Sequence, residues 1–209
     1  MAGRNAERLN SVWAALLAAF VMWYFIFGLQ LFNFWVSMAV AAALLTAVAL
    51  WQQGAPLSRK ELNKQALVLG LLSALVLYLI FVVGNILSGW IFSFAGEQVA
   101  SVYENKAQAS PWLIAFLLLF IIGPAEEIFW RGFVQRRFVA RWGDWSGLLA
   151  ATAAYTLVHI WAANLMLLLA AMVGGLFWGY LYQRSGSLAP VIISHAVWDV
   201  LIFILLPVA

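Results

Sequence analysis

Six ionisable side chains lie within strongly apolar stretches of this sequence, and their types and spacing suit hydrolytic chemistry. They are Glu126, Glu127, Arg131, His159, His195 and Asp199. A glutamate in a water-filled cavity of low dielectric can act as general base on a water molecule. An imidazole can donate a hydrogen bond to the oxyanion of a tetrahedral intermediate. Because ionisable groups inside apolar helices are costly and usually mark function, this set is the candidate site.

Helical spacing relates these side chains in pairs. Glu127 and Arg131 are four residues apart and stack on one helical face, where their charges can neutralise each other. Glu126 points about 100° away from Glu127, so it is left to face a cavity. His195 and Asp199 are also four residues apart, and the carboxylate can hold one imidazole nitrogen and fix its tautomer. Each pair taken alone also fits a structural role, as an interfacial helix end or a buried ion pair.

The same side chains suggest a metal site. Glu126, His159 and His195 could ligate one zinc ion, with water in the open fourth position. Counting at about 1.5 Å per residue along helices places the three in the inner half of a membrane, within reach of one cavity. The chain has no cysteine, which excludes a thiolate metal site, a cysteine nucleophile and a disulfide framework. The residues alone leave metal-bound and metal-free chemistry both open.

The composition indicates an integral membrane protein. Of 209 residues, 66% are apolar and only 9% are charged, whereas a soluble globular domain carries about 25% charged residues. The formal net charge of +3 does not indicate a nucleic-acid partner, because the cations gather in loops as topology signals do. We therefore expect the lipid bilayer, and no nucleic acid, among the partners.

Apolar runs separated by polar segments predict about seven transmembrane helices. Residues 12–51 are too many for one span of roughly 20 residues and suit two, divided near Gly28 and Asn33. This run also exceeds the apolar core of a signal peptide, so the first helix is expected to stay uncleaved. The other five spans are expected at 65–94, 111–142, 146–161, 164–183 and 188–207. The prediction is an all-α, polytopic helix bundle that forms a single integral membrane domain over 1–209.

The positive charges predict the orientation of the bundle. With the N-terminus inside, the outer segments contain a single cation, Lys106, beside Glu97 and Glu104. All other cations fall on the inner side: Arg4, Arg8, Arg59, Lys60, Lys64, Arg131, Arg136, Arg137, Arg141 and Arg184. This agrees with the positive-inside rule and predicts an inner N-terminus and an outer C-terminus.

Two shorter signals concern local structure. Ser58 and Glu61 have the spacing of a capping box at a helix start. Gly175 and Gly179 form a Gly-x-x-x-Gly pair, which we interpret as a place of close helix packing and not as a ligand site.

Three motifs in order resemble those of the CPBP family of intramembrane metalloproteases. They are Glu126-Glu127-x-x-x-Arg131, an aromatic residue four before a histidine at Tyr155 and His159, and His195-x-x-x-Asp199. That family contains the CAAX prenyl endopeptidases and proteins of bacteriocin processing, immunity and lysostaphin resistance. The resemblance covers roughly residues 110–205, which we take as the catalytic core.

The resemblance implies roles for these residues. Glu126 and His159 would activate the attacking water, and Arg131 would fix the glutamate motif through Glu127. His195 with Asp199 would bind or support the oxyanion.

Two positions depart from the family pattern. Tyr155 stands in place of the usual phenylalanine, and Asp199 stands where asparagine is frequent. An ionised aspartate cannot donate to an oxyanion, so its role would shift to orienting His195 or assisting a metal.

The expected function is therefore an intramembrane endopeptidase of the cell membrane, with several membrane passes. Its substrate would be a membrane-associated peptide or lipidated protein, such as a CAAX-prenylated tail or a leader peptide. The main alternative is a non-proteolytic bacteriocin-immunity or membrane scaffold protein. A further alternative is a small transporter that uses Glu126 and the histidines as a proton relay.

Overall fold

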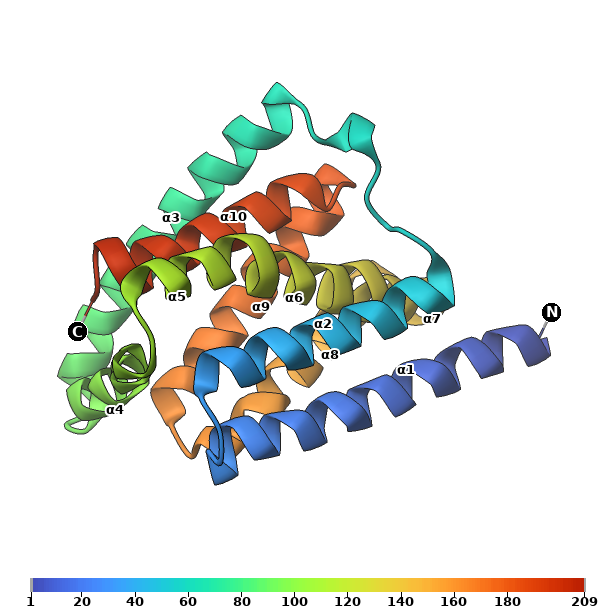
Figure 1. Cartoon of the computed structure of the whole chain (residues 1–209). Helices are drawn as coiled ribbons and strands as arrows, with labels where there is room; N and C mark the ends of the chain where they lie inside the picture. The colour runs from blue at the N-terminus through green and yellow to red at the C-terminus, as the bar shows by residue number, and fades with distance from the viewer. Residues whose placement is uncertain (1, 209) are drawn as a thin grey trace.

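The computed structural model describes residues 2–208, and within them every regular element is a helix. Side chains are described from Asn10 onward, so Arg4 and Arg8 of the predicted inner cations lie outside the described side chains. Figure 1 shows the N- and C-terminal ends at opposite sides of the bundle. The helices are α1 (Ala2–Trp23), α2 (Phe34–Gln53), α3 (Lys64–Ile91), α4 (Ala95–Tyr103), α5 (Pro111–Leu117), α6 (Gly123–Phe129), α7 (Arg136–Trp142), α8 (Asp144–Val158), α9 (Leu165–Ser185) and α10 (Ala189–Val200). The all-α prediction is confirmed for the described residues.

Turns of π-helix join or extend several of these helices. The π turns are Tyr24–Leu29, Leu118–Ile122, Trp130–Gln135 and Leu201–Leu205, and the 3₁₀ turns are Arg59–Glu61, Glu104–Gln108 and His159–Ala162. Two π turns connect α5, α6 and α7 into one rod over Pro111–Trp142, which we call the central rod. They flank α6, which carries Glu126 and Glu127. Such widened turns occur frequently at functional sites.

Five helices are long and apolar enough to cross a membrane, and the protein is an integral membrane protein. They are Asn10–Leu29, Phe34–Gln53, Lys64–Ile91, Pro111–Trp142 and Leu165–Ser185. The fifth and seventh predicted spans also form helices, α8 and Ala189–Leu205, but both are shorter. The count of seven spans, the inner N-terminus and the single domain therefore stay predictions.

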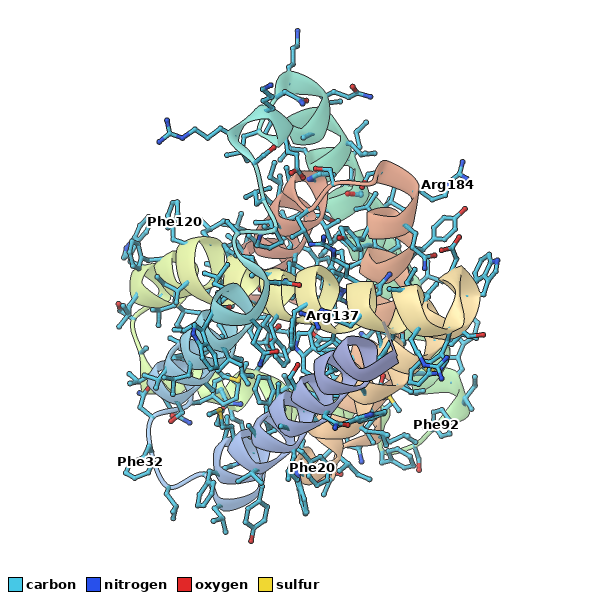
Figure 2. The ribbon with its side chains drawn as sticks, turned by 90° about the vertical axis from the view of Figure 1, so that its right-hand side faces the viewer. Phe20, Phe32, Phe92, Phe120, Arg137 and Arg184 are labelled. Atoms are coloured by element: carbon cyan, nitrogen blue, oxygen red, sulfur yellow. The ribbon has the colours of Figure 1, made fainter. Side chains whose placement is uncertain are left out.

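The outer surface is apolar, as a bilayer requires. Phe32 and Phe120 point away from the bundle in Figure 2, with 75% and 64% of each residue exposed. Trp90 is 80% exposed. Apolar surface of this extent is unfavourable in water but fits the hydrocarbon of a membrane.

Polar side chains just before the first turn explain where four of the helices begin. The side-chain oxygens of Asn33, Asn63, Ser110 and Asn164 each accept the backbone N–H three residues further on. This satisfies a donor that the first turn of a helix leaves unpaired. Pro111 follows Ser110 at the first helical position, where a missing N–H costs nothing.

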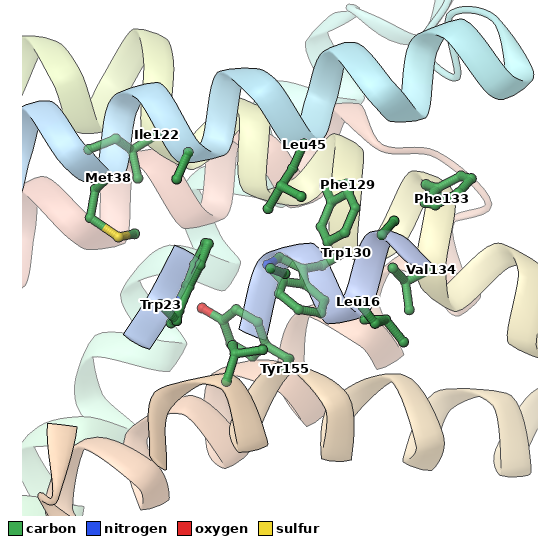
Figure 3. Packing of buried hydrophobic residues seen from close by; sticks show 14 of the residues in the cluster. Leu16, Trp23, Met38, Leu45, Ile122, Phe129, Trp130, Phe133, Val134 and Tyr155 are labelled. Atoms are coloured by element: carbon green, nitrogen blue, oxygen red, sulfur yellow. The ribbon is translucent and has the colours of Figure 1, made fainter. Parts of the chain in front are cut away.

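The main apolar core lies between α1, α2, the central rod and α8, and Figure 3 shows its aromatic centre. Trp23 meets Trp130 edge-on at 6.4 Å between ring centroids, and Trp130 meets Tyr155 in the same way at 5.2 Å. All three rings are buried. This packing fixes the position of Tyr155, which also borders the candidate site.

Glycines allow α8 to approach its neighbours closely. A Cβ on Gly175 would lie 3.0 Å from Thr152 Cγ2, and a Cβ on Gly179 would overlap Leu148. The interpretation of the Gly-x-x-x-Gly pair as a packing site is confirmed. On the other side of α8, a Cβ on Gly147 would overlap the backbone of Val139 in α7.

Glu61 ties the loop before α3 to the start of α10. Its carboxylate accepts hydrogen bonds from Ser187 Oγ at 2.6 Å, from Leu188 N at 3.2 Å and from Ser58 N at 2.9 Å. The predicted capping box is confirmed. Partial burial opposes ionisation of this group, but the bonds from Ser187 and from the Ser58 and Leu188 backbones outweigh it, so the pKa of Glu61 lies below 4.5.

We predict that Gly147→Ala destabilises the protein, because its new methyl group would force α7 and α8 apart at the backbone of Val139. Overpacking of this kind costs about 1–3 kcal/mol. Thermal unfolding of the purified protein in detergent measures the effect. Gly89→Ala in α3 is the matched control, since no atom lies within 4 Å of its Cβ position. Equal unfolding temperatures for the two variants would contradict the packing role.

We predict that the stabilisation provided by Glu61 depends on pH. Its folded-state pKa is lowered below the usual glutamate value of 4.5. The contribution is therefore complete above that value and is lost as the pH falls through the folded-state pKa. The difference in unfolding temperature between wild type and Glu61→Gln should be largest near neutral pH and shrink below pH 4.5. A difference that stays constant down to pH 3 would exclude the charge as its cause.

Candidate functional site

Four of the six predicted side chains line one cavity. Its volume is about 180 Å³, and Glu126, His159, His195 and Asp199 form part of its wall. These residues come from α6, from the 3₁₀ turn that follows α8, and from α10. Glu127 and Arg131 are buried beside them but do not line the cavity. The predicted meeting of separate helices around one cavity is confirmed.

Glu127 joins two basic groups. Its Oε1 accepts a hydrogen bond from Arg131 Nη1 at 2.8 Å and lies 2.6 Å from His195 Nδ1. Both Glu127 and Arg131 are almost completely buried, with exposures of 0% and 2%. The predicted pairing of Glu127 with Arg131 is confirmed, and the contact with His195 extends it to α10.

Arg131 is held from several sides. Its Nη2 donates to the backbone carbonyls of Gly174 and Gly175 in α9, at 3.4 and 3.5 Å. Its guanidinium lies over the rings of Tyr155 and Trp178, at 4.9 and 5.5 Å from their centroids. Cations interact favourably with aromatic faces at such distances. Groups from the central rod, α8 and α9 therefore surround the buried charge of Arg131.

His195 is oriented by Glu127 and by a stacked ring. Trp178 stacks on the imidazole with 3.8 Å between ring centroids and 21° between planes. Since Nδ1 donates to the Glu127 carboxylate, Nε2 is the nitrogen that faces the other carboxylates. Nε2 lies 3.7 Å from Glu126 Oε2 and 3.6 Å from Asp199 Oδ2.

The contacts of His195 confirm one expectation in part: Asp199 lies within ion-pair distance of Nε2, but it does not make the hydrogen bond that orients the ring. The i, i+4 spacing predicts that Asp199 holds an imidazole nitrogen. At 3.6 Å that contact is too long for a hydrogen bond, and Glu127 makes the short one instead. The physical reason is that α6 packs against α10 and presents Glu127 to Nδ1, which leaves Asp199 as a nearby negative charge.

Glu126 has the environment of a reactive carboxylate. Its Oε2 accepts a long hydrogen bond of 3.5 Å from the Tyr155 hydroxyl. Its Oε1 has no hydrogen-bond partner among residues 10–208, although the atom is buried. Buried oxygens are normally satisfied, so this one is available to a water molecule or a ligand in the cavity.

His159 lines the same cavity but is engaged by its own neighbours. Its Nδ1 donates to the Tyr155 carbonyl at 2.8 Å, and its Nε2 accepts from Trp23 Nε1 at 3.3 Å. Trp23 and Trp178 are the residues that sequence reasoning missed. Nothing in their spacing distinguishes them from the other tryptophans, because both contacts form only when distant helices pack.

The predicted zinc ligands do not form a cluster here. Within the described residues, no three His, Asp or Glu side chains are grouped as a metal ion requires. The Nε2 lone pair of His159 faces the Trp23 N–H and not Glu126 or His195. The three side chains do not fit a zinc ion in this arrangement, and the zinc site stays a prediction.

Comparison with known families agrees with the three motifs. Residues 108–201 match the family model described as type II CAAX prenyl endopeptidase Rce1-like. The match spans all six candidate residues and confirms the resemblance to the CPBP family. At the level of that family, it supports a membrane protease that acts on a protein substrate. Comparisons with curated proteins and with solved structures gave no match.

We predict that Arg131→Met strongly destabilises the protein. The change removes the cation that faces the buried Glu127 carboxylate, and breaking a buried pair in this way costs about 3–5 kcal/mol. Thermal unfolding in detergent measures it. Arg136→Met, at an exposed position of the same rod, is the control and should change stability by less than about 1 kcal/mol. An equally small effect for both variants would show that the Glu127 network is not a stabilising element.

Proposed function

Since residues 108–201 match the Rce1-like CAAX endopeptidase family, we propose that this protein is an intramembrane endopeptidase. It would hydrolyse a peptide bond of a membrane-associated substrate with a water molecule activated by Glu126. The observation that carries the proposal is the unpaired Oε1 of Glu126, buried at the wall of a cavity that His195 and Asp199 also line.

In the proposed reaction Glu126 is the general base. Its carboxylate takes one proton from water as the water oxygen attacks the peptide carbonyl carbon. The carbonyl electron pair moves to the oxygen and gives a tetrahedral oxyanion. When the intermediate collapses, the C–N bond breaks and protonated Glu126 returns the proton to the departing amine.

His195 is proposed to support the oxyanion. Its Nε2 lies 3.7 Å from Glu126 Oε2, on the side where the reacting water would sit. The carboxylates of Glu127 and Asp199 favour a positive charge on the ring, and this charge makes Nε2–H a donor. Glu127 and Arg131 are positioning residues in this scheme, because they act through His195 and do not line the cavity.

Two expectations from the family resemblance, the role of His159 and the zinc site, are kept as modified proposals. His159 would bound the water site and hold Tyr155, since both of its nitrogens are already hydrogen-bonded. A zinc site formed by Glu126, His159 and His195 stays a proposal, and no step of the reaction above depends on it, because these side chains do not fit the ion in this arrangement. His159 would first have to leave the Trp23 N–H.

The proposed substrate is a membrane-bound peptide, either a CAAX-prenylated tail or a leader peptide, and the proposed location is the cell membrane. Support comes from the family match and from the apolar surface of the helices. A non-proteolytic immunity or scaffold protein would keep the fold without needing the Glu126 carboxylate, so one variant separates the two functions.

We predict that Glu126→Gln abolishes peptide cleavage. Glutamine has nearly the same size but cannot accept the proton, and loss of a general base typically lowers the rate by about 10²–10⁴-fold. Purified protein is incubated with lipidated and unlipidated peptides, and products are identified by mass spectrometry, with and without a chelator. Loss of wild-type cleavage in the chelator would support the zinc site.

Glu104→Gln is the matched control, because this carboxylate is exposed and does not line the cavity. It should cleave like the wild type. Wild-type rates for Glu126→Gln would overturn the proposed mechanism. A folded wild type that cleaves none of the peptides, while its biological effect persists in Glu126→Gln, would favour the scaffold function.

A further inference from the structure

Trp198 has an unpaired polar group beside the candidate site. It lies in α10 between His195 and Asp199 and is buried, with 9% of the residue exposed. Its indole Nε1 has no hydrogen-bond partner within the described part of the chain. Buried donors without a partner are rare and call for an explanation. One explanation is that a ligand supplies the acceptor.

Trp198 lines two cavities. One is the cavity lined by Glu126, His195 and Asp199, and the other is an apolar cavity of about 340 Å³ between α3, α4, α9 and α10. The ring is fixed by Phe81 on one side and Trp178 on another, at 4.7 and 5.3 Å between centroids. The indole is therefore a rigid wall element and does not need to be ordered when a ligand arrives.

No polar group of the apolar cavity accepts this N–H within the described residues. The polar side chains there donate elsewhere: Asn85 Nδ2 to Val208 O, Ser88 Oγ to Asn85 O, and the Tyr103 hydroxyl to Ile202 O. The cavity lined by Glu126, His159, His195 and Asp199 is where a substrate carbonyl would enter, and Trp198 is part of its wall.

Of the five buried tryptophans in the described chain, three donate through the indole N–H and two do not. Trp23 donates to His159, Trp35 to the Asn105 carbonyl, and Trp178 to Ser194. Trp130 is the other buried indole whose N–H lacks a partner, and it lines neither cavity. Trp198 thus combines a free donor with a place at the site.

We propose that the Trp198 indole N–H donates a hydrogen bond to the carbonyl oxygen of the scissile peptide and holds the oxyanion that forms from it. This inference rests on the proposed function. Asp199 cannot donate when ionised, and the Nδ1 of His195 is bound to Glu127, so His195 Nε2 alone would be a single donor. Trp198 supplies a second, neutral donor. It transfers no proton: water adds to the carbonyl carbon, the electron pair moves to oxygen, and both donors keep their hydrogens.

The test removes the N–H and keeps the ring. Trp198→Phe should lower kcat by about 10²–10³-fold, the typical loss for one oxyanion donor, and change KM little. Replacement of Trp198 by β-(3-benzothienyl)alanine, in which sulfur replaces the N–H at constant shape, should have the same effect. This second variant keeps the test valid if the smaller phenylalanine disturbs folding. Trp112→Phe is the control and should retain wild-type kcat, because this residue is 87% exposed and lines neither cavity.

A second readout follows the bond itself. In the ¹⁵N-indole spectrum of the Glu126→Gln protein, a substrate peptide should move the Trp198 N–H proton downfield and leave the signal of the exposed Trp112 in place. Wild-type kcat in the benzothienyl variant, or an unmoved Trp198 signal with peptide bound, overturns this inference and leaves the endopeptidase proposal intact. Absence of cleavage by wild type overturns the endopeptidase proposal and this inference together.

Discussion

The carboxylate of Glu127 accepts hydrogen bonds from the Arg131 guanidinium and the His195 imidazole, and no part of it is exposed. A buried charge is tolerated only when it is paired and hydrogen-bonded. The position of α10 relative to the central rod must therefore satisfy this contact. Arg131 adds α9 to the same constraint through the carbonyls of Gly174 and Gly175. One buried carboxylate thus sets the relation among the helices that form the cavity.

Two adjacent glutamates divide structural and chemical tasks. Helical geometry turns consecutive side chains about 100° apart, so Glu127 enters the buried ion network while Glu126 faces the cavity. The network binds Glu127 through its Oε1. The Oε2 of Glu127 and the Oε1 of Glu126 are both buried and unpaired within the described residues, but of the two glutamates Glu126 is the one that lines the cavity. Glu127 therefore contributes to the packing of the helices, and the neighbouring Glu126 is left for chemistry in the cavity. The two π turns beside α6 adjust the rotation of this segment within the rod.

Two tryptophan side chains hold the histidines of the site. Trp178 stacks on His195, and Trp23 donates to His159. In a membrane protein the hydrophobic effect does not drive helices together, so packing and interhelical hydrogen bonds must do so. Tryptophan provides both, because its large ring fills space and its N–H needs a partner. The same property makes the unpaired N–H of Trp198 informative.

Spacing along the chain determined the all-α class, the helix start at Pro111, and the Glu127–Arg131 pair, because each depends on residues within a few positions of one another. The three motifs likewise identified one group of residues, which the family match later supported. Tertiary structure alone decided that Glu127 binds His195, across 68 residues, in place of Asp199. The physical reason is that Glu127 and His195 lie on different helices, and helical spacing relates only residues within a few positions of one another on the same helix. Only packing between helices sets which side chains face inward.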